Sequence, residues 1–134
     1  MSILSARPAV NETSKKVAQS FPRDARLLKH ADFQAVYKNG RKHFSGNMTA
    51  FYRQNDRATG SRVGFTVGKV LGGAVVRNRI RRRMRSAVRQ HLRELAAPLD
   101  LVLHPRKSVL TIKFAQLDAE VAQVFAAVQR GKGR

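Results

Sequence analysis

The densest chemical feature of the sequence is a run of arginines, RNRIRRRMR, at residues 77–85. Eight arginines lie between Arg77 and Arg93, and the first acidic residue after them is Glu94. An exposed helix face normally mixes charges of both signs, and this segment does not. A guanidinium group binds phosphate through paired hydrogen bonds and stacks on nucleobases, which an ammonium group cannot do. The segment therefore predicts a surface that binds nucleic acid.

A basic amphipathic helix on an anionic membrane is the main alternative. Such a helix needs large apolar anchors, whereas the stripe opposite the arginines consists mainly of Val, Ile, Met and Ala. These side chains are better suited to packing on a sheet, so the membrane is the weaker interpretation. The glycine pair at 72–73 also places the amides of a helix N-terminus beside the first arginines, which favours an anion.

The whole composition agrees with a polyanion as the partner. Lys and Arg number 27 against 8 Asp and Glu in 134 residues, which gives a formal charge of +19 and a pI near 11.8. The hydrophobic fraction of 43% suffices for one globular domain. Such a charge surplus repels itself, so we expect the free protein to be only marginally stable.

The sequence offers little for catalysis by its own side chains. Cysteine is absent, which excludes disulfides and thiolate chemistry. The acids are scattered without the spacing of a metal site, and the four histidines share no motif. We expect His91, on the apolar stripe, to be a packed core histidine. We therefore predict no catalytic and no metal-binding residue, although distant acids or histidines could still converge into a nuclease site.

Periodicity predicts alternating helices and strands. Phe33, Val36 and Tyr37 share one face of a helix that Gly40 ends. In the segment 61–68, an apolar face of Val and Phe alternates with a nearly bare face of Gly and Thr. The expected elements are a helix at 30–40, strands at 41–45, 47–54 and 61–68, a long helix from 74 to about 97, a strand at 99–105 and a helix at 114–130.

These elements predict an α+β sandwich in a single RNA-binding domain. We place a flexible N-terminal arm at 1–22, the domain at 23–130 and a frayed tail at 131–134. The sequence shows no apolar run long enough to span a bilayer and no secretory signal, so we expect a cytoplasmic protein.

Three segments carry a resemblance to a known family. DFQAVYKNG, RVGFTVGK and GGAVVRNRIRRRMR, in this order and spacing, resemble the protein subunit of bacterial ribonuclease P. The resemblance extends from about Arg26 to Arg130. It implies a two-layer α+β sandwich with a small four-stranded sheet, about three helices and a left-handed βαβ crossover that carries the arginine-rich helix.

The resemblance also implies a function. The chain would be an accessory subunit of a ribozyme endoribonuclease that removes the 5′ leader from precursor tRNA. Catalysis would belong to the RNA subunit, with Mg²⁺ held mainly by RNA and no cofactor bound by the protein alone. The protein would raise substrate affinity and lower the Mg²⁺ requirement. We expect a monomer in a 1:1 complex with the catalytic RNA, with precursor tRNA as substrate, and no partnership with DNA or membrane.

Carried over by position, the resemblance assigns two sets of site residues. The residues expected to bind the catalytic RNA are Lys69, Arg77, Asn78, Arg79, Arg81, Arg82, Arg83, Arg85 and Arg89. The residues expected to form a cleft for the single-stranded 5′ leader are Phe33, Tyr37, Thr49, Phe51, Thr66 and Gly68. Aromatic side chains beside small ones make a trough in which unpaired bases stack. The alternative is that the two aromatic residues of the helix simply pack in the core.

The sequence departs from the family pattern just before the arginine helix. The family commonly has a hydroxyl residue and two lysines, then Gly-Asn-Ala-Val, where this chain has GKVLGGAV. Val70 and Gly73 therefore stand where a basic and an asparagine side chain would be expected. Two other functions remain in competition: a structural RNA-binding protein without a leader cleft, and a protein nuclease with its own active site.

Overall fold

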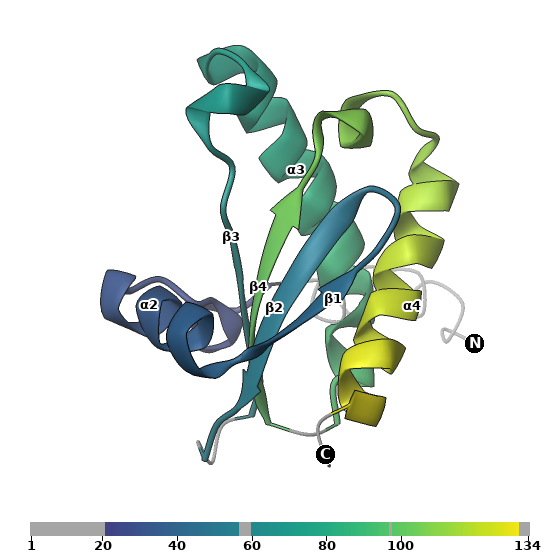
Figure 1. Cartoon of the computed structure of the whole chain (residues 1–134). Coiled ribbons are helices and arrows are strands. Elements are labelled where there is room, and N and C mark those ends of the chain that lie inside the picture. The colour runs from purple at the N-terminus through teal and green to yellow at the C-terminus, as the bar shows by residue number, and fades with distance from the viewer. Residues whose placement is uncertain (1–20, 57–59, 97, 132–134) are drawn as a thin grey trace, which may run out of the picture.

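The structure, a computed structural model, describes residues 21–56, 60–96 and 98–131 (Figure 1). The strands are β1 (Arg41–Phe44), β2 (Met48–Gln54), β3 (Arg62–Phe65) and β4 (Leu99–Pro105). The α-helices are α2 (His30–Asn39), α3 (Ala74–His91) and α4 (Phe114–Gly131). The connections contain four 3₁₀ helices: η1 (Arg23–Ala25), η2 (Lys69–Leu71), η3 (Leu92–Glu94) and η4 (Lys107–Leu110).

The four strands form one mixed sheet in the order β1-β2-β4-β3. β2 pairs antiparallel with both β1 and β4, whereas β3 pairs parallel with β4. The parallel pair makes β3–α3–β4 a crossover unit that carries the arginine-rich helix. The α+β class, the four-stranded sheet and the three α-helices expected from the sequence are thus confirmed in the described part of the chain. The left-handed sense of the crossover stays a prediction.

The main core lies between one face of the sheet and the pair α3 and α4. Side chains alternate along β2, so that Met48, Ala50 and Tyr52 are buried in this core. β4 is buried along most of its length because helices cover both of its faces. The helices contribute Ile80, Met84, Ala87, Val88, Leu117, Val121, Val124, Phe125 and Val128.

A smaller cluster on the opposite face holds α2 against the sheet. Leu27, Val36 and Val102 are buried there, with Phe33, Tyr37 and Phe51 packed around them. α2 therefore lies across the sheet from α3 and α4 (Figure 1). No helix in the described part of the chain is long and apolar enough to cross a membrane.

Two elements end earlier than the sequence predicts. β3 stops at Phe65, because the chain turns toward η2 after a last hydrogen bond from Thr66 N to Leu103 O (3.0 Å). α3 stops at His91 and continues as the tighter helix η3. The Gln129 side chain of α4 caps this end, since Ala96 N donates to its Oε1 (2.8 Å).

The folded domain includes Phe21, which the sequence analysis placed in the arm. Phe21 is buried and packs edge-to-face on Phe65, with ring centroids 6.1 Å apart. Arg26 Nε donates to the carbonyl of Phe21 at 3.0 Å, which fixes the backbone there. The remainder of the expected arm, residues 1–20, and the tail from 132 onward lie outside the described residues.

Candidate nucleic-acid interface

α3 presents its arginines because its other face is needed for the core. Ile80, Met84 and Val88 are buried against the sheet, at the i, i+4, i+8 spacing of one helical stripe. Arg82 and Arg85 are exposed on the outer side. A hollow of about 570 Å³ crosses this outer side, and we call its lining the arginine surface: Asn78, Arg81, Arg82, Arg85, Ser86 and Arg89.

Local hydrogen bonds orient several of the predicted RNA-binding residues. Arg81 Nη1 donates to Asn78 Oδ1 at 2.9 Å, so the asparagine holds one guanidinium of the arginine surface in place. Arg77 Nε donates to the carbonyl of Gly72 at 3.1 Å, across the start of the helix. Arg83 points elsewhere: its Nη2 donates to the carbonyl of Ile112, just before α4. Arg79 is exposed but lies outside the arginine surface.

Acidic side chains do not neutralise these arginines. Among the described residues, the arginines of α3 form no ion pair, whereas Arg62 pairs with Asp32 and Asp100, and His91 contacts Glu94 and Asp118. The Arg62 pair is bidentate toward Asp100, with contacts of 2.9 and 2.7 Å. The arginine surface therefore keeps its positive charge available for an external anion.

Lys69 stands apart from the arginine surface. It lies exposed in η2, next to Val70, which is 94% exposed. Gly72 follows with φ of +139°, a conformation that L side chains rarely adopt. The connection thus turns sharply into α3 and leaves Lys69 near the N-terminal end of the helix.

α2 and the sheet enclose a second candidate region, on the opposite face. Tyr37 packs edge-to-face on Phe51 and on His104, with centroid distances of 5.2 and 5.5 Å. The ring centroids of Phe51 and His104 lie 4.7 Å apart. We call Tyr37, Phe51 and His104 the aromatic cluster. Its rings are half-buried, so they are supported from below and still reachable from solvent.

The aromatic cluster is fixed by hydrogen bonds at its centre. The Tyr37 hydroxyl hydrogen-bonds with Thr66 Oγ1 at 2.7 Å and with His104 Nε2 at 2.8 Å. Burial lowers the pKa of His104 below the ordinary value for histidine. The imidazole is therefore neutral at neutral pH, and it serves as a flat ring rather than as a cation.

Gly64 explains how Phe33 reaches the sheet. A Cβ at Gly64 would lie 2.6 Å from Phe33 Cζ and 3.0 Å from Leu27 O, so a larger residue would displace the ring from its present position. Phe33 then lines two hollows, one shared with Tyr37 and Thr66 and the other with arginines of α3. Apolar side chains and arginines together line the second hollow: Phe21, Arg26, Leu27, Leu28, Phe33, Gly64, Phe65, Arg81 and Arg85. It joins the aromatic region to the arginine surface.

The structure brings most of the predicted cleft residues together. Phe33, Tyr37, Phe51 and Thr66 meet around α2, as described above, and Thr49 lies in register with His104. Gly68 does not join them, because β3 has already ended and the residue is exposed at the start of η2. Phe33 and Tyr37 pack against the smaller cluster, as the alternative of a purely core role predicts. Both nevertheless stay half-exposed.

Sequence reasoning did not place His104 beside Tyr37 and Phe51, which it contacts in the aromatic cluster. Its strand reads as a buried apolar run, LDLVLHP, in which the histidine is the last residue before the proline. The available signal was alternation: His104 falls two residues after Val102 and therefore on the same face, toward α2. His91 is a correction. The sequence predicts a core histidine, whereas the structure leaves His91 half-buried outside the buried core and hydrogen-bonded to Glu94 and, at 3.0 Å, to Asp118.

Comparison with known proteins decides the family. The family model described as Ribonuclease P matches residues 21–129. The chain belongs to the ribonuclease P family. It is 32% identical over 102 residues to the ribonuclease P protein component of Finegoldia magna, covering 76% of this chain and 88% of that protein. The protein component of Citrifermentans bemidjiense is 33% identical over 113 residues, covering 84% and 96%.

Solved structures agree with this assignment. The RNase P protein of Staphylococcus aureus superposes with a TM-score of 0.67 at 27% identity, covering 78% of this chain and 94% of that one. The RNase P protein from Thermotoga maritima shares the fold, with a TM-score of 0.69 at 24% identity, covering 76% and 96%. As a family member, the chain is a protein component of ribonuclease P, an endoribonuclease of tRNA processing, and its partner is the ribonuclease P RNA.

Proposed function

We propose that the chain binds the catalytic RNA of ribonuclease P through the arginine surface and holds the 5′ leader of precursor tRNA in the cleft between α2 and the sheet. The observation that carries this proposal is the pairing of two surfaces. One is rich in arginines without carboxylate partners, and the other presents half-exposed rings. The hollow lined by Phe33, Arg81 and Arg85 joins them. The leader can therefore run from the catalytic RNA into the cleft while its phosphates stay near positive charge.

The proposed mechanism is electrostatic. Two RNA molecules, catalyst and substrate, repel each other, and cations must neutralise their phosphates before they can associate. The guanidinium groups of Arg82, Arg85 and Arg89 would supply part of that charge and so replace part of the Mg²⁺. The protein would thereby raise substrate affinity and lower the Mg²⁺ concentration at which the holoenzyme works.

We assign bond cleavage and the Mg²⁺ ions to the RNA. In the parts of the chain that the structure describes, no three His, Cys, Asp or Glu side chains are grouped so that they could hold a metal ion. Among the described acids, Asp32 and Asp100 pair with Arg62, and Glu94 and Asp118 contact His91. We place the complex in the cytoplasm, with one protein monomer on each RNA.

The test is cleavage of a precursor tRNA at low Mg²⁺ by the cognate ribonuclease P RNA, with and without this protein. Each component is also run alone. We expect efficient cleavage only when RNA and protein are combined, and recovery of the RNA-only reaction at high Mg²⁺. Cleavage by the protein alone, surviving repurification, would overturn the assignment of chemistry to the RNA. Binding without stimulation would instead favour a structural RNA-binding protein.

A further inference from the structure

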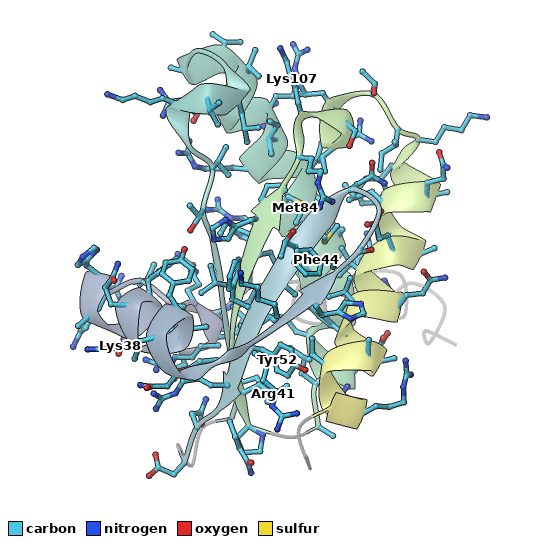
Figure 2. All side chains as sticks on the ribbon, viewed as in Figure 1. Lys38, Arg41, Phe44, Tyr52, Met84 and Lys107 are labelled. Atoms are coloured by element: carbon cyan, nitrogen blue, oxygen red, sulfur yellow. The ribbon has the colours of Figure 1, made fainter. Side chains whose placement is uncertain are left out.

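Phe44 is an aromatic side chain that lies exposed at the edge of the sheet. It is 67% exposed on β1, the strand that ends the sheet on the side opposite β3 (Figure 2). Phe114, the other exposed phenylalanine among the described residues, is 37% exposed. A single apolar side chain on a surface is ordinary, so exposure alone carries no conclusion. The position of Phe44 in the strand register, in contrast, does indicate a role.

The register puts Phe44 in line with the aromatic cluster. Phe44 pairs with Thr49, and Thr49 pairs with His104, so these three residues form a row across three strands on one face. The next row on the same face contains Lys42, Phe51 and Val102. Phe44 is therefore the diagonal neighbour of Phe51, at a separation that aromatic side chains can bridge.

Two cations flank this row. Lys42 Nζ lies 5.5 Å from the centre of the Phe51 ring. On the other side, Arg106 Nη1 donates to Ser45 O at 2.7 Å, and Nη2 lies 3.3 Å from Thr49 Oγ1. Arg106 is exposed, and its guanidinium is held by the β1–β2 turn. The strands β1 and β2 contain no acidic residue. The edge thus combines a ring with positive charge on both sides, which suits a base and its phosphates.

We propose that Phe44 is an outer stacking position that extends the leader cleft to the edge of the sheet. This inference rests on the proposed leader binding and adds an occupant: the unpaired leader nucleotide farthest from the cleavage site. The direction follows from the fold. The hollow that joins the cleft to the arginine surface lies at Phe33, beside β3, and β1 is three strands away. A leader that leaves the catalytic RNA therefore meets Phe33 first and Phe44 last.

Stacking on a single ring accepts every base, because each base has a π face. Arg106 and Lys42 contact phosphate, which carries no sequence information. The outer position therefore makes binding depend on leader length and not on leader sequence. Leaders too short to reach Phe44 gain nothing from it.

The test uses the holoenzyme and precursor tRNAs whose leaders grow one nucleotide at a time. The variants are Phe44→Ala, Phe44→Tyr, which keeps a ring, and Phe114→Ala as a matched control at the start of α4. We expect Phe44→Ala to weaken binding of long leaders roughly five- to tenfold and to leave short leaders unchanged. Phe44→Tyr and Phe114→Ala should follow the wild type. Circular dichroism and the low-Mg²⁺ cleavage of a short-leader substrate confirm that each variant is folded and active.

The outcomes separate this inference from the function on which it rests. Equal affinities of wild type and Phe44→Ala at every leader length overturn the outer position, even if the wild type stimulates cleavage. An equal loss at all lengths also overturns it, because the residue would then act on the catalytic RNA or on the fold. A change of oligomeric state in sedimentation, with a flat leader series, assigns Phe44 to a contact between copies of the chain. Failure of the wild-type protein to stimulate cleavage overturns the proposed function itself.

Discussion

Arg82 and Arg83 are neighbours in the sequence but have different surroundings in the fold. Arg82 is exposed on the arginine surface, whereas Arg83 donates to the carbonyl of Ile112 and ties α3 to the start of α4. Arg82→Ala should leave the free energy of unfolding within about 0.5 kcal/mol of the wild type, as surface changes do. It should weaken binding of the catalytic RNA and reduce the salt dependence of that binding by about one phosphate contact.

Arg83→Ala should lower stability more than Arg82→Ala does and should affect RNA binding less. Loss of a charged donor to a half-buried carbonyl should cost about 1–3 kcal/mol of stability. Its RNA affinity, measured well below the melting temperature, should change less than that of Arg82→Ala. Urea denaturation and RNA titration over a range of salt concentrations measure both quantities. Equal effects of the two substitutions on RNA binding would show that the partner RNA reaches both sides of the helix.

Tyr37 separates stacking from hydrogen bonding within the aromatic cluster. Tyr37→Phe keeps the ring on Phe51 but removes the hydroxyl that contacts Thr66 and His104. We expect a loss of about 1 kcal/mol in stability, because two half-buried polar partners lose a hydrogen bond. Leader affinity should stay close to that of the wild type, whereas Tyr37→Ala should lower it several-fold. A large loss of leader affinity in Tyr37→Phe would show that the hydroxyl itself contacts RNA.

At the scale of elements, His91 joins α3 to α4. Its Nε2 lies 3.0 Å from Asp118 Oδ1 and its Nδ1 hydrogen-bonds with Glu94. Burial opposes the charged ring, but the two carboxylates outweigh burial and raise the pKa of His91 above its ordinary value. The folded state therefore binds the proton more tightly than the unfolded chain does.

The sign of the pH dependence follows from that difference. The stabilisation by His91 is fully present below about pH 6.5, the ordinary histidine value, and is lost as pH rises through the higher folded-state pKa. The difference in unfolding free energy between wild type and His91→Gln should therefore shrink with rising pH. Urea denaturation at several pH values measures it. Taking the difference removes the contribution of His104, whose lowered pKa acts in the opposite sense. A difference that does not change with pH would show that the contacts of His91 with Asp118 and Glu94 do not stabilise the charged ring.

How far the sequence predicts this structure depends on the distance over which each contact acts. The apolar stripe of α3 is a local periodicity that the sequence shows directly, and the burial of Ile80, Met84 and Val88 confirms it. The strand order, which puts β4 between β2 and β3, is set by packing between distant segments. For that reason alternation in β4 gives the face on which His104 lies, but no local pattern predicts that it meets Tyr37, 67 residues away. His91 was misread because its carboxylate partner on α4 lies 27 residues away.

For the whole molecule, the distribution of the few acids matters more than their number. The chain carries 27 basic and 8 acidic side chains. Asp100 is buried and forms an ion pair with Arg62. Glu120 accepts hydrogen bonds from Ser45 Oγ (2.6 Å) and Asn47 N (2.7 Å) at the β1–β2 turn. These carboxylates stabilise connections inside the fold, so they do not screen the arginine surface. The free protein therefore carries a repulsive patch that only an external anion relieves.

This arrangement predicts that anions stabilise the free protein through the arginine surface. The melting temperature should rise more in sulfate or phosphate than in chloride at matched ionic strength, because an ion that binds only the folded state shifts unfolding by mass action. A triple variant, Arg82→Ala, Arg85→Ala and Arg89→Ala, should be at least as stable as the wild type in dilute chloride, since it removes like charges. It should also lose most of the extra stabilisation by sulfate. A triple variant that melts lower in chloride yet keeps the full sulfate response would show that the arginines support the fold and that the anion binds elsewhere.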